Sequence, residues 1–475
     1  MNRKKLLFYI FSYCLLHTFE KRLQAQAISA GGRHSLAICA DSTVVAWGYN
    51  GFGQLGNGNE IEQHSGTAVI GLTKIIHVAG GLFHSLFVHN DGSVFSCGRN
   101  ATGALGVGGT TNAFIPLLIG SLSKTKKVAA GGEHSLFLSE DGSVWACGQN
   151  ASGQLGDGSN QTKTSPVRIS GLSDVVQLAA GAEFSLFLKS DGSVWACGHN
   201  GFGQFGNGSK KSSNVPVHIN GLSGIVQISA GEWHSTFVDK DGRVYTCGRN
   251  QYGQLGDGTT TDKELASLVP GLDDILMAEA GGIHTVFVKR DGSVFACGLN
   301  SGGNNNGQLG DGTTIDRSSP VGVIPAWFPG DIIHAEATRE NSLFVRSDGS
   351  LWASGRNNYG QLGIGAFSNN NAATALPATA VCKTVWLTAA EDPKEVHSIN
   401  IYPNPTQNSI YVDTQADLTD VSIVVSDVSS RPIHIWENVQ EKTLKLDLDL
   451  NAGMYFLKIV KDHKLLTCRK LMIQK

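Results

Sequence analysis

The stretch that decides the fold lies at residues 130–156 and reads AGGEHSLFLSEDGSVWACGQNASGQLG. It holds two short apolar runs on either side of an Asp-Gly pair and ends in a glycine-rich segment. The same Asp-Gly pair recurs about every 50 residues, at Asp91-Gly92, Asp141-Gly142, Asp191-Gly192, Asp241-Gly242, Asp291-Gly292 and Asp348-Gly349. A period of this length is typical of solenoids, propellers and arrays.

Each copy of the repeat is predicted to form β-strands only. The Asp-Gly pair suits a two-residue hairpin turn with positive φ, so the apolar runs on either side predict a β-hairpin. Apolar runs such as 167–169 and 175–178 add about two more strands per copy, and no helical period is present. Four strands make one propeller blade, and seven copies can be counted. The 475 residues therefore predict an all-β chain built around one seven-bladed β-propeller rather than several unrelated domains.

The repeated submotifs Gly-Gly-x-His-Ser, Asp-Gly and Gly-x-Asn-x-x-Gly-Gln-Leu-Gly resemble the repeat of the regulator of chromosome condensation family. The resemblance covers roughly residues 28–388 and implies a closed seven-bladed β-propeller. Single copies depart from the pattern at Ser42 in place of the turn glycine, Phe184 and Asn341 in place of the histidine, Ala104 in place of the glutamine, and an insertion at 301–306.

Composition narrows the range of partners and cofactors. The chain has 37 Lys and Arg against 40 Asp and Glu, so it lacks the basic excess of a nucleic-acid-binding protein. Five of the nine cysteines share one repeat position, namely Cys97, Cys147, Cys197, Cys247 and Cys297. Equivalent positions in different blades lie too far apart for a disulfide, so these are predicted to be small buried residues at strand ends. The alternative, a thiolate metal ring, lacks C-x-x-C spacing, and no metal or cofactor is expected.

The first residues are typical of a secretory signal. Arg3-Lys4-Lys5 precedes an apolar run at 6–16, and Ala25-Gln26-Ala27 offers a small-x-small cleavage site. We therefore predict a signal peptide at 1–27. The apolar run is too short to anchor the chain in a bilayer, so no integral membrane segment is expected in the mature chain.

The last residues form a second pattern. The propeller is predicted at 28–389, a charged linker at 390–396 and a small β-sandwich domain at 397–475. This tail resembles the type IX secretion sorting domain of Bacteroidetes in the motif residues Tyr402, Pro403, Asn404, Pro405, Gly453 and Tyr455. The resemblance implies recognition by the type IX secretion machinery, passage through the periplasm, and a secreted or outer-surface location.

No catalytic group stands out in the repeats. One histidine per blade is what packing symmetry gives, and we expect a hydrogen bond between strands or blades from each of His34, His84, His134, His234 and His284. Residues 139–145 resemble the Asp-box of sialidases, but they are one residue short and turn chemistry explains the Asp-Gly pair. The Asn-Gly and Asp-Gly pairs that follow Gly-Gln-Leu-Gly lack the acidic spacing of calcium loops.

Recognition is expected where copies differ. The residues before the repeated histidine vary, and the predicted partner-binding face consists of Arg33, Leu82, Phe83, Glu133, Glu183, Glu232, Trp233, Ile283, Arg339 and Glu340. Two further variable sets are ranked below it. They are the residue between Gly and Asn (Tyr49, Arg99, Gln149, His199, Arg249, Leu299, Arg356) and the loop aromatics Phe52, Phe202, Tyr252 and Tyr359.

These observations predict a secreted or cell-surface, non-enzymatic propeller that binds a protein or glycan. One alternative is a secreted inhibitor of an extracellular enzyme, since some bacterial propellers of the family inhibit β-lactamases. The other is a glycan hydrolase or lyase with its site in the propeller mouth, which would require carboxylates converging at the axis.

Overall fold

The computed structural model describes residues 28–301, 306–323, 332–347, 349–365 and 369–375, and the strands between residues 400 and 473. Every regular element in these residues is a β-strand. The chain divides into a compact unit at Ala25–Leu387 and a second unit that contains Thr388–Lys475. The predicted limits of signal peptide, propeller, linker and tail stay predictions.

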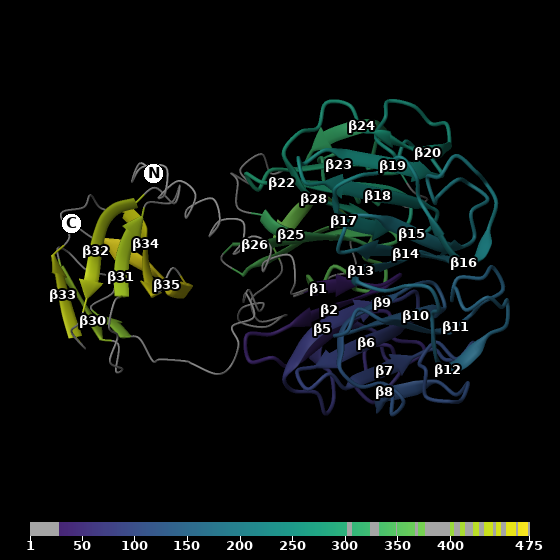
Figure 1. Ribbon diagram of the computed structural model, residues 1–475, viewed down its shortest axis with the longest axis horizontal. Helices are drawn as coiled ribbons and strands as arrows, with labels where there is room; N and C mark the ends of the chain where they lie inside the picture. Colours follow the sequence, from purple (N-terminus) through teal and green to yellow (C-terminus); the bar gives the residue numbers. More distant parts are fainter. Residues whose placement is uncertain are drawn as a thin grey trace. The chain divides into compact units, whose positions relative to one another are not determined.

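The larger unit is a propeller of seven four-stranded antiparallel sheets, each made of consecutive strands (Figure 1). The first strands are β1 (Ile28–Ala30), β5 (Ile75–Gly80), β9 (Thr125–Ala130), β13 (Val175–Ala180), β17 (Ile225–Ala230), β21 (Ile275–Ala280) and β25 (Ile332–Ala337). The second strands are β2 (His34–Ile38), β6 (His84–His89), β10 (His134–Ser139), β14 (Phe184–Lys189), β18 (His234–Asp239), β22 (His284–Lys289) and β26 (Asn341–Arg346). First strands of neighbouring blades contact one another, including β1 with β25, so the ring is closed.

The outer half of each blade completes the sheet. The third strands are β3 (Val44–Gly48), β7 (Val94–Gly98), β11 (Val144–Gly148), β15 (Val194–Gly198), β19 (Val244–Gly248), β23 (Val294–Gly298) and β27 (Leu351–Gly355). The fourth strands are β4 (Gln63–Ala68), β8 (Ala113–Leu118), β12 (Lys163–Arg168), β16 (Ser213–His218), β20 (Lys263–Leu268), β24 (Arg317–Gly322) and β28 (Asn370–Ala375). The prediction of an all-β, seven-bladed propeller is confirmed, and the blades are numbered 1 to 7 in chain order below.

The Asp-Gly turn differs in one detail from the prediction. In blade 3, Gly142 N–H donates to Ser139 O (3.0 Å) and Ser139 N–H donates to Ser143 O (2.9 Å), which leaves a three-residue loop. The expected two-residue turn was wrong, because only the glycine has positive φ (79° at Gly142). At the one copy without this glycine, Ser42 adopts the same left-handed conformation, with φ of 61°.

The hydrophobic core lies between blades rather than inside one. One cluster joins Leu136 and Val144 of blade 3 to Phe187 of blade 4, and other neighbouring blades pack in the same way. Each blade from 2 to 7 contributes one fully buried phenylalanine at the same position, namely Phe87, Phe137, Phe187, Phe237, Phe287 and Phe344. Because no blade buries its faces alone, the blades stabilise one another.

The repeated histidine is part of a polar contact between blades. His134 Nε2 lies 3.0 Å from Ser185 Oγ of blade 4, and Ser185 Oγ donates to the Gln154 carbonyl of blade 3 (2.7 Å). Because the hydroxyl donates to the carbonyl, the imidazole Nε2 must be the donor to the hydroxyl. The same contact joins His34 to Ser85, His84 to Ser135, His234 to Thr285 and His284 to Ser342. The predicted interblade hydrogen bond of the histidines is present in all five copies.

Blade 1 and blade 7 meet through a variant of this contact. Trp47 occupies the position of the repeated cysteines, and its Nε1–H donates to Gln361 O (2.9 Å). Ser35 Oγ donates to the same carbonyl (3.2 Å). Ile28 and Trp47 pack against Leu343 and other blade 7 residues in one core cluster. The ring is therefore closed by an indole as well as by apolar packing.

The five repeated cysteines are buried and free, as predicted. Burial raises the pKa of each thiol well above its ordinary value. Cys147 Sγ, for example, lies 3.5 Å from Ala104 O of the preceding blade. The thiols are thus protonated packing groups at the blade interface. Cys39 is disulfide-bonded.

The tail forms two antiparallel sheets. One has the order β29-β30-β33 and the other β32-β31-β34-β35. Their strands are β29 (Asn400–Tyr402), β30 (Ser409–Asp413), β31 (Val421–Ser426), β32 (Pro432–Val439), β33 (Thr443–Asp447), β34 (Gly453–Lys461) and β35 (Lys464–Ile473). The packing of these sheets as a sandwich stays a prediction.

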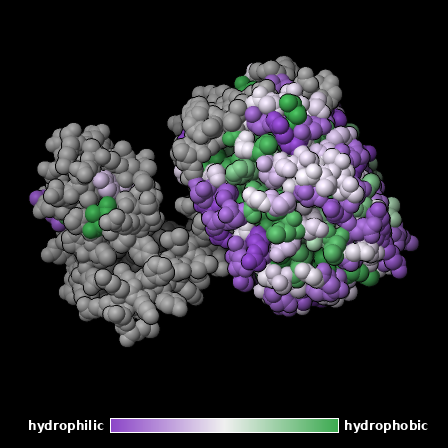
Figure 2. Space-filling view, turned by 90° about the horizontal axis from the view of Figure 1, so that it is seen from above, coloured by the Kyte–Doolittle hydropathy of each residue, from purple (hydrophilic) through white to green (hydrophobic). Residues whose placement is uncertain are grey.

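Hydrophobic and hydrophilic residues are interspersed over the visible propeller surface (Figure 2). The outer strand β8 exposes four large apolar side chains, namely Phe114, Ile115, Leu117 and Leu118. Pro116 in the middle of this strand has no N–H to offer a further strand, which limits pairing along this edge.

The interblade contact predicts the effect of substituting one histidine. His134→Ala should destabilise the propeller by about 1–3 kcal/mol, because it empties a buried position and removes the donor to Ser185. His134→Phe should cost less, since Phe184 fills the same position in blade 4. Urea unfolding of both variants measures the difference. Equal losses for the two variants would contradict this account.

The histidines also predict a pH dependence of stability. Burial lowers the pKa of His34, His134, His234 and His284 from 6.5 to about 3 and that of His84 to about 4. The unfolded chain therefore binds protons first as the pH falls. The contribution is complete above about pH 6.5 and is lost as the pH drops toward 3–4, by up to about 1.4 kcal/mol per pH unit for each histidine. Urea unfolding between pH 7 and 5 measures this slope, which His134→Phe should reduce.

Candidate functional site

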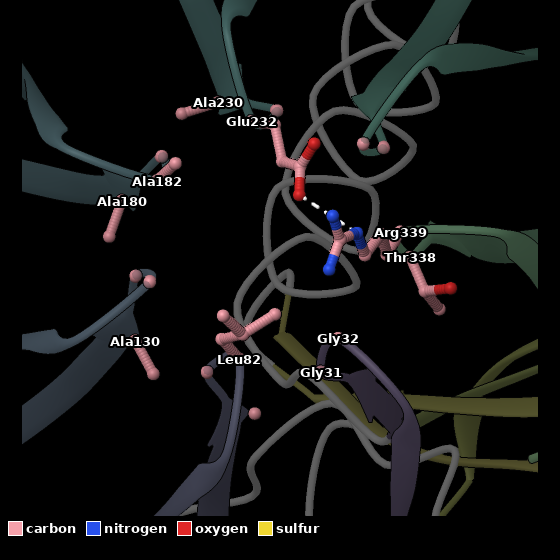
Figure 3. Close-up of a pocket in the computed structure, with 18 of the residues that line it drawn as sticks. Gly31, Gly32, Leu82, Ala130, Ala180, Ala182, Ala230, Glu232, Thr338 and Arg339 are labelled. Atoms are coloured by element: carbon pink, nitrogen blue, oxygen red, sulfur yellow. Dashed lines mark ion pairs between the residues drawn. The ribbon is translucent and has the colours of Figure 1, made fainter. Parts of the chain in front are cut away.

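The two residues before each histidine occupy two different places. The first residue of each pair, such as Leu82 or Glu232, lines a pocket of about 110 Å³ on the propeller axis (Figure 3). The second residue, such as Phe83 or Trp233, packs against an aromatic ring in a loop of the preceding blade. All these pairs are buried or partly buried rather than fully exposed.

The pocket wall is built from backbone and small side chains of all seven blades. Alanines at the ends of the inner strands and the following glycines form most of it. Backbone N–H groups join neighbouring blades here, for example Leu82 N to Gly131 O (3.1 Å) and Gly132 N to Gly181 O (3.1 Å). A Cβ at Gly131 would lie 2.5 Å from Gly181 O and 2.2 Å from the His134 ring, so this position requires glycine.

One ion pair lies at the pocket. Glu232 Oε1 of blade 5 and Arg339 Nε of blade 7 are 3.0 Å apart, and they point toward each other in Figure 3. Gly282 of blade 6 lines the pocket between them, and a Cβ there would meet Arg339 O at 2.7 Å. Leu82 reaches toward the same space from another side. Among the residues that line this pocket, Glu232 is the one carboxylate.

The second residue of each pair contacts the loop of the preceding blade. Phe83 of blade 2 meets Tyr49 (6.0 Å between ring centroids) and Phe52 (5.2 Å) of blade 1. Trp233 of blade 5 likewise meets His199 (5.2 Å) and Phe202 (5.6 Å) of blade 4. These edge-to-face contacts join the three variable sets, which the sequence ranked separately, into one layer around the axis.

Arginines cover several of these rings. Arg99 lies over Phe52, Arg249 over Phe202, and both Arg33 and Arg356 over Tyr359. Ion pairs join Arg99 to Glu133 and Arg356 to Glu340. Glu183 accepts a hydrogen bond from Ser152 Oγ (2.8 Å). Leu299, from the set ranked below the predicted face, is buried.

The remaining repeat residues serve the framework. Asp141 Oδ1 accepts hydrogen bonds from the Ser143 N–H (2.9 Å) and hydroxyl (2.7 Å), and these lower the pKa of the carboxyl below its ordinary value. Asp157 Oδ1 accepts from the buried Asn150 amide (3.1 Å). Over the part of the chain that the structure describes, no group of three His, Cys, Asp or Glu side chains could hold a metal ion.

Sequence reasoning missed two glutamates on the inner strands. Burial, and second the Glu336 carboxylate, raise the pKa of Glu279 well above its ordinary value. Gln227 Nε2 donates to Glu279 Oε1 (2.9 Å), and His334 lies 3.3 Å from Glu336. Other blades have alanine or serine at this position, such as Ala79 and Ser229. An acidic residue where other copies are small was the signal that could have revealed them.

The sorting-motif residues of the tail are only partly described. Tyr402 ends β29, Gly453 begins β34, and Tyr455 is partly buried in the same strand. Pro403, Asn404 and Pro405 lie outside the described residues. Within the described residues, no helix is long and apolar enough to cross a membrane.

Comparison with known families agrees with the repeat and the tail. Residues 41–88, 91–138, 141–188, 191–238 and 241–288 match the regulator of chromosome condensation (RCC1) repeat, and a second form of this repeat matches from residue 25 to residue 254 in five segments. The chain therefore belongs to the regulator of chromosome condensation repeat family. Residues 400–474 match the secretion system C-terminal sorting domain, which confirms the predicted type IX sorting domain.

Solved structures share the propeller fold. Human WBSCR16 matches with a TM-score of 0.63 and 22% identity, over 70% of this chain and 94% of that one. Yeast RCC1 (Prp20), solved bound to Kap60, matches with a TM-score of 0.62 and 21% identity, over 77% of this chain and 87% of that one. At this level of identity the likeness shows the fold.

Proposed function

We propose that the protein is a non-enzymatic propeller, displayed on the outer surface or secreted, that binds a macromolecular partner through the face around the axial pocket. The observation that carries this proposal is the layer of variable residues on that face. Aromatic rings, arginines and glutamates from different blades contact one another there, while the framework residues beneath them repeat. Aromatic and arginine side chains are the residues that dominate binding energy at interfaces.

Export is supported by the tail and by one cysteine. A type IX sorting domain implies secretion or attachment to the outer surface by the type IX machinery. The disulfide at Cys39 fits a compartment in which disulfides persist, such as the periplasm or the cell exterior. The five other propeller cysteines are buried and protonated, so they do not compete for oxidation.

Binding is favoured over a hydrolase in the propeller mouth. The described pocket holds one carboxylate, Glu232, and Arg339 neutralises it. Glu279 and Glu336 do influence each other, but neither lines the pocket, and Gln227 and His334 engage them. A glycosidase needs a carboxyl pair that flanks a bound sugar. Inhibition of an extracellular enzyme is one form that the proposed binding could take.

Removing the tail tests the export part of the proposal. Deletion of residues 397–475 should leave the propeller folded, because the two units form separate compact bodies. The truncated chain should accumulate in the periplasm of the native host, as measured by cell fractionation and by thermal unfolding of the purified product. Arrival of the truncated chain at the surface or in the medium would refute the sorting role.

Substitution of Trp233 tests the binding face. Trp233→Ala should weaken binding by about 2 kcal/mol or more, as loss of an aromatic anchor does, and should cost about 1 kcal/mol of stability through its contacts with His199 and Phe202. The measurements are the melting temperature and the affinity for the partner recovered by the full chain from the native culture. Leu265→Ala, on the outer strand β20, is the control. Unchanged affinity would move the site elsewhere.

A further inference from the structure

Arg99 and Arg249 occupy the same repeat position and the same kind of surroundings. Arg99 of blade 2 lies 5.5 Å from the centroid of Phe52, which belongs to the loop of blade 1. Arg249 of blade 5 lies 5.4 Å from the centroid of Phe202, in the equivalent loop of blade 4. The two arginines therefore provide an internal comparison, in which the repeat holds most of the environment constant.

The two arginines differ in their acidic partner. Arg99 forms an ion pair with Glu133, the residue before the histidine of blade 3. The residue of blade 6 equivalent to Glu133 is Ile283. The pre-histidine residue of Arg249's own blade, Trp233, is also uncharged. Arg249 instead donates from Nε (3.1 Å) and Nη2 (2.5 Å) to the neutral Gln251 amide oxygen.

Three arginines of the face, Arg99, Arg339 and Arg356, form ion pairs with glutamates, whereas Arg33 contacts a tyrosine. Arg339 pairs with Glu232 and Arg356 with Glu340. Arg33 lies over Tyr359 and donates to its hydroxyl (3.4 Å). Across the described residues, Arg249 has no carboxylate contact, although its guanidinium lies as close to the Phe202 ring (5.4 Å) as that of Arg99 does to Phe52 (5.5 Å).

A stacked guanidinium is prepared to bind a carboxylate. Gln251 accepts from the Nε and Nη2 edge of Arg249, so Nη1 remains for a carboxylate, and Nη1 is the atom through which Arg99 meets Glu133. The face of the Phe202 ring itself is covered, so a neutral sugar would lose the apolar platform that it needs. Trp233 contacts Phe202 from the side and adds apolar surface next to the charge.

We propose that Arg249 binds an Asp or Glu side chain of a protein partner, in the position that Glu133 takes beside Arg99. This inference rests on the proposed binding face and names the chemistry of its occupant. The partner's acidic residue is flanked by an apolar one, because Ile283 takes the repeat position of Glu133 and Arg249 N–H donates to Trp233 O (2.9 Å). The neutral glycan is the occupant that the proposal rejects.

The experiment uses a phage library of random peptides, panned on the full-length chain and on three variants. Arg249→Gln removes the guanidinium, and Ile283→Glu supplies an internal carboxylate at the position equivalent to Glu133. Leu265→Glu adds the same charge on β20, away from the face, and serves as the control. Thermal unfolding confirms that each variant is folded.

The expected result is enrichment of Asp or Glu next to an apolar residue on the unsubstituted chain and on Leu265→Glu, with loss of this enrichment on the other two variants. A synthetic selected peptide should bind Arg249→Gln about tenfold more weakly or worse, and replacing its acidic residue with the amide should cause no further loss. Peptides without acidic enrichment, or with affinity unchanged by Arg249→Gln, would overturn the proposal. If Trp233→Ala still weakens those peptides, the binding face stands and only the acidic occupant is wrong. If neither substitution matters, the proposed function fails as well.

Discussion

The hydroxyl one residue after the histidine position of each blade joins that blade to the preceding one through a single oxygen atom. Ser185 Oγ accepts from the His134 imidazole and donates to the Gln154 carbonyl, and both of those groups belong to the preceding blade. Both ends of this contact are buried, so loss of either partner leaves a polar group without a hydrogen bond in the interior. The contact fixes the spacing of neighbouring blades, and the inner strands, the axial pocket and the loop layer depend on that spacing.

Blades 4 and 7 show which part of this contact is essential. Phe184 replaces the imidazole, yet Ser235 still donates to Gln204 O (2.6 Å). Asn341 replaces the histidine of blade 7, and Ser35 of blade 1 still donates to Gln361 O (3.2 Å). The hydroxyl-to-carbonyl bond is therefore present with or without the imidazole. The histidine adds a donor and fills volume, and because burial keeps it neutral at ordinary pH it contributes no charge to the face above it.

The sequence alone correctly predicted the features that depend on the 50-residue repeat and on the residue type at each repeat position. The Asp-Gly spacing predicted the blade hairpins, and a shared position predicted that Cys97 and its equivalents are buried and unbridged. The turn length was missed because a type I turn followed by a left-handed glycine has the same Asp-Gly pair as a two-residue turn. Single-residue contacts across blades were also missed, since a repeat shows that positions are equivalent but not which neighbour they touch. The meeting of Phe52 with Phe83, from different variable sets and different blades, is such a contact.

The residues that hold the blades together are different from those that form the proposed binding face, and this explains why the face can vary between copies of the repeat. The glycine at Gly131 and its equivalents has no room for a side chain, and the histidine and hydroxyl are committed to the blade contact. The residues between them line the pocket or contact side chains of the preceding blade, and this second position holds Glu133 in one copy and Ile283 in another. A change at such a position alters the charge balance of a neighbouring arginine without altering the blade. The face thus consists of pairs of side chains that can change one at a time while the ring of blades stays the same. At Arg249 the repeat position of the acidic partner holds Ile283, so the positive charge of this arginine is available to a carboxylate of another molecule.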